Sequence, residues 1–191
     1  AAGWNTNNNN QALYRDASNT NKFYFTGKFG TSMFKLLEIL GDNTWQPQWG
    51  LKGGVVANSD GGEPEPFTVS TAGYYTFEVD ILAKTYSITP YSGAMTTYSS
   101  IDIAGNLNGW SGSTVLTQSS FDPHQWFIKD LVVSSNGEAK FRANGTWDIN
   151  WGAAAEFSGQ GTQGGANIPL NAGTYDVYFN DIDGRYVFVK K

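Results

Sequence analysis

The chain has 191 residues, 15% of them charged and 15% aromatic, and this length suffices for one large domain or two domains of about 100 residues. Its 12 Lys and Arg residues and 17 Asp and Glu residues give a formal net charge of -5, which argues against a nucleic-acid partner because basic patches supply most of that affinity. Because the chain has no cysteine and a single histidine, His124, we expect no disulfide, no thiolate or zinc site and no other cofactor.

Alternation of apolar and polar residues is the dominant pattern and predicts β-strands. In chain order, the expected strands cover residues 33–40, 75–81, 101–105, 138–145, 175–179 and 185–189. The first of these is read as a mostly buried strand, since it is too short and uncapped for a helix. Glycine fills 23 positions, many in Asn-Gly, Asp-Gly and Gly-Gly turn pairs, so we expect an all-β, antiparallel sandwich.

An internal repeat divides the chain in two. The segment 71–75 returns as 171–175, the segment 44–50 as 146–152, and the segment 3–5 as 109–111. We therefore predict two tandem Ig-like antiparallel β-sandwich modules, residues 1–92 and 98–191, joined by a short Pro/Gly/Ser/Thr-rich linker. The first strand of the second module has no counterpart before Gly3, so the N-terminal strand of the first module is expected to be missing and the chain to be part of a longer protein.

Tryptophans recur at matched places in the two modules. They are Trp4, Trp45 and Trp49 in the first module and Trp110, Trp147 and Trp151 in the second. Core packing is the ordinary role of such large rings. Trp110 and Trp151, however, lie among Asn, Gly and Ser residues, and rings on turns are hard to bury. Flat apolar rings of this kind suit bases or pyranose rings, and the acidic composition favours the sugars.

A sugar site also needs hydrogen-bond donors, since desolvated hydroxyls without partners cost about 1–3 kcal/mol each. The strand 138–145 places Lys140, Arg142 and Asn144 on one side of its pleat. These side chains could form an ordinary solvated face. Their position directly before Trp147 and Trp151 favours a role in binding.

Three motifs carry a resemblance to a known family. They are the segments 106–110 (NLNGW), 139–152 (AKFRANGTWDINWG) and 171–175 (NAGTY). This pattern resembles the starch-binding modules of SusE and SusF, outer-membrane glycan-binding lipoproteins of Bacteroidetes starch utilisation systems. It is more distantly similar to the glycogen-binding modules of starch-branching enzymes and AMP-activated kinase.

The resemblance implies a non-catalytic module in which two rings cradle an α-1,4-glucan. Trp110 and Trp151 correspond to the cradle, Trp147 to a third ring, and Arg142, Lys140 and Asn144 to the hydrogen-bonding side chains. It also implies starch or maltooligosaccharide as partner, possible association with an outer-membrane glycan transporter complex, and a cell-surface location at the outer membrane through an anchor upstream of this chain.

The first module departs from the pattern. Lys35 matches Lys140, but Leu37 stands where the second module has Arg142, and the following turn is three residues longer. We expect Trp4, Trp45, Trp49 and Lys35 to form a weaker or altered glycan site.

Three alternatives stay open beside glycan binding. A glycoside hydrolase needs two carboxylates at a cleft, and the candidates are Glu63, Glu65, Asp148 and Glu156. None of these recurs in the other module as a carboxylate pair, so we expect no enzyme. The loop 181–184 has the oxygen-rich character of a calcium loop but is better explained as an Asp-Gly hairpin turn. A structural adhesin or protein-interaction sandwich, with rings as apolar anchors, is the third alternative.

Overall fold

The computed structural model describes residues 11–39, 45 and 47–191. The chain divides into two compact units: residues 1–13 and 21–92 form the first unit, and residues 14–20 and 93–191 form the second. The described residues contain β-strands and two short 3-10 turns, at Ser59–Gly61 and Asn106–Asn108, but no α-helix. The predicted all-β, antiparallel fold class is confirmed.

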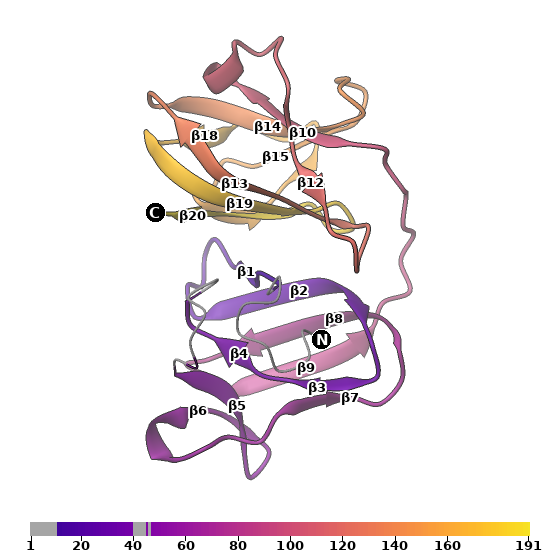
Figure 1. Ribbon diagram of the computed structural model, residues 1–191, viewed down its shortest axis with the longest axis vertical. Coiled ribbons are helices and arrows are strands. Elements are labelled where there is room, and N and C mark those ends of the chain that lie inside the picture. Colours follow the sequence, from indigo (N-terminus) through magenta and orange to yellow (C-terminus); the bar gives the residue numbers. More distant parts are fainter. Residues whose placement is uncertain (1–10, 40–44, 46) are drawn as a thin grey trace. The chain divides into compact units, whose positions relative to one another are not determined.

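The second unit is a sandwich of two antiparallel sheets, drawn in orange, salmon and yellow in Figure 1. One sheet has the order β11-β10-β14-β15-β17, with β18 also paired to β14, and the other has the order β12-β13-β19-β20-β16. The first sheet comprises β10 (Ile101–Gly105), β11 (Thr114–Val115), β14 (Gly137–Ala143), β15 (Asn150–Gly152), β17 (Thr162–Gln163) and β18 (Ile168–Leu170). The second comprises β12 (Thr117–Gln118), β13 (Gln125–Val133), β16 (Ser158–Gln160), β19 (Gly173–Asn180) and β20 (Arg185–Lys190).

The core of the second unit lies between these sheets. Phe141 of β14 stacks on Phe179 of β19, with ring centroids 4.3 Å apart, and Tyr186 of β20 is completely buried. The short strand β1 (Tyr14–Arg15) also belongs to this unit, where the Tyr14 hydroxyl donates to Gln125 Oε1 at 2.8 Å. Buried apolar side chains from both sheets therefore hold this unit together.

The first unit carries shorter sheets around an aromatic core. Its strands are β2 (Lys22–Phe29), β3 (Ser32–Phe34), β4 (Leu36–Leu37), β5 (Gln48–Lys52), β6 (Val55–Asn58), β7 (Phe67–Val69), β8 (Gly73–Asp80) and β9 (Thr85–Pro90). They pair as β2-β8-β9, β3-β7 and β4-β5-β6. Phe67 and Phe77 are fully buried and lie edge to face, 5.2 Å apart.

The predicted strands are largely confirmed, with two corrections. The expected buried strand 33–40 is interrupted at Lys35, between β3 and β4, and Met33 is 50% exposed. The expected strand 138–145 ends at Ala143, because Asn144 and Gly145 both have positive φ and form a turn. The loop 181–184 is the turn between β19 and β20, so the hairpin interpretation is confirmed.

Register shows that the two units repeat one another closely at their C-terminal hairpins. Val79 pairs with Tyr86 in the first unit, and Phe179 pairs with Tyr186 in the second, at a constant offset of 100 residues. The described residues include no helix with the length and hydropathy of a membrane span. They also include no group of three or more His, Asp or Glu side chains placed to hold a metal ion.

Candidate functional site

Trp110 lies on the loop that leaves β10. After Gly105 the chain makes the 3-10 turn Asn106–Asn108 and then takes positive φ at Gly109 and at Trp110 itself. The Asn108 side chain fixes this loop to β10, because its Oδ1 accepts from the Gly105 amide at 3.0 Å and its Nδ2 donates to the Ile103 carbonyl at 2.8 Å. The half-buried Trp110 ring is therefore held on a braced turn.

Trp147 lies on the loop that leaves the neighbouring strand, β14. Asn144 begins this loop in the left-handed region, and its Oδ1 accepts from the Ser99 amide at 3.0 Å and the Ser99 hydroxyl at 2.8 Å. At the other end, Asn150 Nδ2 donates to the Trp147 carbonyl at 2.8 Å. The Trp147 side chain is 43% exposed, a large fraction for an indole whose loop is fixed at both ends.

The two loops bring Trp110 and Trp147 together, and we call these two residues the indole pair. Their ring centroids are 6.0 Å apart and their planes are inclined by 34°. It is the only contact between two tryptophan rings among the residues that the structure describes. Two neighbouring indoles at this inclination present apolar faces that do not share a plane.

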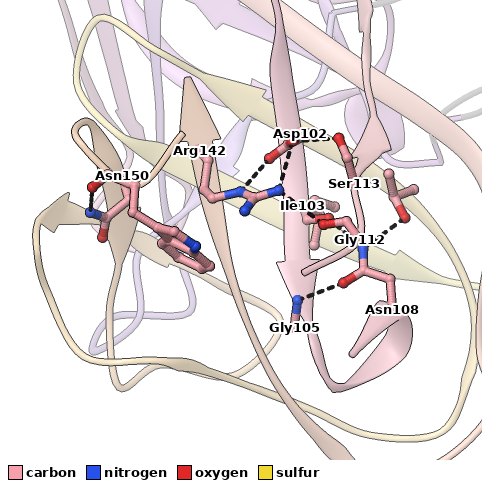
Figure 2. Close-up of polar contacts among 10 residues, drawn as sticks. Asp102, Ile103, Gly105, Asn108, Gly112, Ser113, Arg142 and Asn150 are labelled. Atoms are coloured by element: carbon pink, nitrogen blue, oxygen red, sulfur yellow. Dashed lines mark hydrogen bonds and ion pairs between the residues drawn. The ribbon is translucent and has the colours of Figure 1, made fainter. Parts of the chain in front are cut away.

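A buried ion pair joins the two strands from which these loops leave, and Figure 2 shows it between Arg142 and Asp102. Arg142 of β14 donates from Nε to Asp102 Oδ1 at 2.9 Å and from Nη2 to Asp102 Oδ2 at 3.0 Å, a bidentate arrangement. Both side chains are buried, at 4% and 1% exposure. Asp102 also accepts from the Ser113 hydroxyl. The pair joins β10 to β14 because Asp102 and Arg142 are directly opposite in register.

Polar side chains continue across the same face of the sheet. Asn150 is opposite Arg142 in register, and its Oδ1 accepts from Lys140 Nζ at 3.2 Å. The Gln163 side chain of β17 accepts from the backbone amide of Asn150 at 3.2 Å and donates to the Asp148 carbonyl at 2.9 Å. Lys140 and Gln163 are at least partly exposed, so both can offer polar groups beside Trp147.

The expectation that Trp151 stands on an exposed turn is wrong. Its side chain is 8% exposed and packs in the core, 5.2 Å from the Phe179 ring and 5.5 Å from the Tyr98 ring. The reason is that residues 150–152 form strand β15, so the pleat directs Asn150 to one face and Trp151 to the other. Trp147, expected as a third ring, is the exposed one.

The hydrogen-bonding residues predicted from the sequence have different surroundings. Lys140 lies on the polar face as expected, whereas Arg142 is buried and its hydrogen bonds go to Asp102 and to the Gly112 carbonyl. Asn144 is exposed, but its side-chain Oδ1 already accepts hydrogen bonds from Ser99 and Ser100. Asp102, Asn150 and Gln163 were not predicted, although the apolar-polar alternation of residues 101–105 placed one charged side chain, Asp102, inside a buried strand.

Of the residues predicted for a site in the first module, Trp45, Trp49 and Lys35 lie in the described part of the chain. Trp4 lies outside the described residues, and Trp45 is 54% exposed. Trp49 of β5 is half-buried, and its indole N–H donates to Glu38 Oε1 at 3.0 Å. Lys35 forms an ion pair with Glu63, one of the carboxylates considered above for catalysis.

Comparison with known proteins gives a likeness to a solved structure. Neither a family model nor a curated protein matches the chain significantly. Among solved structures, the chain is similar to SusF from Bacteroides thetaiotaomicron, with 18% sequence identity and a TM-score of 0.41 over 100% of this chain. The chain spans 46% of the length of that structure.

Proposed function

We propose that the second unit is a non-catalytic carbohydrate-binding module whose indole pair stacks against the sugar rings of an α-1,4-glucan such as starch or a maltooligosaccharide. The observation that carries this proposal is the contact between the half-buried Trp110 and the exposed Trp147, with centroids 6.0 Å apart and planes inclined by 34°. The apolar faces of hexose rings stack on indoles. Rings that share a plane suit a flat, ribbon-like glycan, whereas inclined rings suit a chain that curves from one sugar to the next.

The surroundings of the indole pair supply the polar groups that a sugar needs. Lys140 and Gln163 both bond to Asn150: Lys140 Nζ donates to its side-chain Oδ1, and Gln163 Oε1 accepts from its backbone amide. The net charge of -5 argues for a neutral partner over a polyanion. A shallow site of two rings and a few hydrogen bonds predicts dissociation constants in the micromolar to millimolar range. These correspond to a favourable binding free energy of about 4–8 kcal/mol.

The wider role follows from the motif resemblance. We propose that the chain holds glucan at a bacterial outer-membrane surface, in the vicinity of a glycan transporter, and that the first unit contributes a weaker site through Trp45 and Trp49. Two weak sites on one chain raise the apparent affinity for long glucans without any new contact.

The indole pair predicts a specific loss of binding. Replacing Trp147 or Trp110 with alanine removes half of the platform, so affinity for maltoheptaose falls by at least about tenfold, the equivalent of about 1.4 kcal/mol. Tryptophan fluorescence titration with maltoheptaose, β-cyclodextrin and cellohexaose measures this change. Because Trp147 is 43% exposed, the thermal midpoint of Trp147→Ala stays close to that of the parent chain.

Two controls complete the experiment. Val132→Ala removes an apolar side chain that is 66% exposed on β13, in the sheet that does not carry the indole pair, and leaves the proposed site intact. Cellohexaose tests curvature, because its β-1,4 chain is flat. The proposal is contradicted if starch in an affinity gel slows the migration of both Trp147→Ala and Trp110→Ala as much as that of the parent chain. Tighter binding of cellohexaose than of maltoheptaose retains a glycan site but rejects α-glucan.

A further inference from the structure

We infer that Arg142 is a positioning residue: clamped by Asp102, it sets the spacing and inclination of Trp110 and Trp147, and it does not serve mainly as a sugar ligand. This inference rests on the proposed function of the indole pair. It gives the buried Asp102–Arg142 ion pair a role in addition to joining the two strands, namely to position the two rings.

The first step concerns Trp110. Besides binding Asp102, Arg142 Nη2 donates to the carbonyl of Gly112 at 2.9 Å. Gly112 lies two residues after Trp110, and its amide donates to the Asn108 carbonyl at 3.1 Å, which closes the loop on itself. A Cβ on Gly112 would come within 2.6 Å of that same carbonyl oxygen, so this close approach of the backbone requires glycine. The guanidinium therefore holds the Trp110 loop in place.

The second step concerns Trp147. The Arg142 Cζ atom lies 4.6 Å from the centroid of the Trp147 ring, within the range of a cation–π contact. One guanidinium thus holds the loop of one indole by a hydrogen bond and contacts the ring of the other. Because the two loops leave adjacent strands, whose register pairs Asp102 with Arg142, both constraints act from one fixed point.

The third step concerns the fixed point itself. A buried cation is tolerated only when it is paired and hydrogen-bonded, and the bidentate contact with the 1% exposed Asp102 meets this condition. The arrangement restricts Arg142 to one rotamer and leaves its side chain only 4% exposed. Such a group is well placed to orient neighbours and poorly placed to follow a ligand.

A ligand-free measurement tests the geometry directly. Two indoles in contact give an exciton couplet in far-ultraviolet circular dichroism, and loss of the couplet in Trp110→Ala and Trp147→Ala assigns the signal to the indole pair. We expect Arg142→Met to weaken the couplet strongly. Arg142→Lys keeps the charge but lacks the planar fork that makes the bidentate contact with Asp102, so we expect it to keep the couplet only in part.

Loss of folding is separated from loss of positioning by a second variant. The double substitution Asp102→Leu with Arg142→Met replaces the buried ion pair with apolar side chains, an exchange that is often neutral or stabilising. We expect this variant to keep the thermal midpoint while it loses the couplet. Arg185→Met, which removes an arginine paired with Asp183 elsewhere in the same unit, is the control and keeps both.

Binding measurements distinguish positioning from direct contact. If Arg142 acts through the rings, Arg142→Met weakens maltoheptaose binding by about five- to thirtyfold in the parent chain, the range of a desolvated cation–π contact. In a Trp147→Ala background it adds a clearly smaller loss, because only the Trp110 loop is left for it to position. An equal loss in both backgrounds, or an unchanged couplet in the double variant, overturns the inference. If the parent chain binds no glucan, the proposed function is rejected but the inference about Arg142 is not. The couplet is measured without ligand and still reports how Arg142 arranges the two rings.

Discussion

The same strand pair carries different side chains in the two units. In the second unit, Arg142 of β14 is opposite Asn150 of β15, and in the first, Leu37 of β4 is opposite Gln48 of β5. The strand that would correspond to β10, and with it a counterpart of Asp102, is absent from the described part of the first unit. A repeat can therefore conserve strands and rings while changing the polar contacts beneath them.

The C-terminal hairpins differ in how they are covered. Tyr186 is fully buried, because the segment 153–161 crosses it: its hydroxyl donates to the Ala155 carbonyl, and Gly159 of β16 lies opposite it in register. Tyr86, at the matching place, is 39% exposed, since residues 53 and 54 alone connect β5 to β6. The length of this connection thus decides whether the last strand of each unit, β9 or β20, has a neighbouring strand along its outer edge.

The largest predicted effect compares two aromatic side chains at matching positions, one on β13 and one on β2. Trp126 is 3% exposed and its indole N–H donates to Asp181 Oδ2 at 2.7 Å, so Trp126→Ala should lower the free energy of unfolding by about 3–5 kcal/mol. Phe23, at the matching position, is half-buried, and Phe23→Ala should cost clearly less. Urea unfolding of the whole chain measures both, and a larger loss for Phe23 would contradict the comparison.

An intermediate effect compares the two hairpin turns. Gly184 has φ 72° and a Cβ there would lie 2.1 Å from the Gly161 carbonyl oxygen, so Gly184→Ala should destabilise the chain by about 1–3 kcal/mol. Lys84 holds the same turn position with φ 57°, and Lys84→Gly should be stabilising by up to about 1 kcal/mol because the backbone strain is relieved. Calorimetry should show midpoints that move in opposite directions, and the comparison fails if they move together.

The smallest effect is a pH dependence confined to the second unit. Burial raises the pKa of Asp181 to about 6, partly offset by hydrogen bonds from Trp126 and His124, while the nearby Asp122 raises it further. Since the folded state keeps this proton more tightly, stability should fall by about 1–2 kcal/mol as pH rises from about 4 to about 6.

Asp181→Asn tests this assignment. It should flatten that part of the pH profile of unfolding, whereas Ile81, the matching residue of the first unit, gives no such dependence. The Asp16 carboxyl, whose pKa is lowered to about 2 by hydrogen bonds from Ser18 and Asn19, acts below this range and in the opposite direction. An unchanged slope in Asp181→Asn would assign the pH dependence to other groups.

The fold class was readable from the sequence because alternation and turn pairs are local signals. The strands at 75–81, 101–105, 175–179 and 185–189 needed no knowledge of their partners. The strand 33–40 was misjudged at Lys35, where burial depends on what the neighbouring strands cover. Alternation identifies a strand but gives no account of where its pairing is interrupted.

The candidate site was only partly readable. Trp110 was placed on a turn correctly because Gly109 and the residues around it are strong local signals. Trp147 and Trp151 were exchanged in role, since Asn150 and Gly152 have turn composition but form a strand through pairing with β14. The burial of Arg142 was not predictable from its own strand, because it depends on Asp102, 40 residues earlier in the chain.

The nine-residue connection at 153–161 has a consequence for how such repeats diversify. It supplies β16, which shields the backbone of β20 from pairing with other chains, and it leads directly into Gln163 beside the rings. A deletion in this connection would therefore uncover the edge of β20 and displace the segment that carries Gln163 in a single evolutionary event.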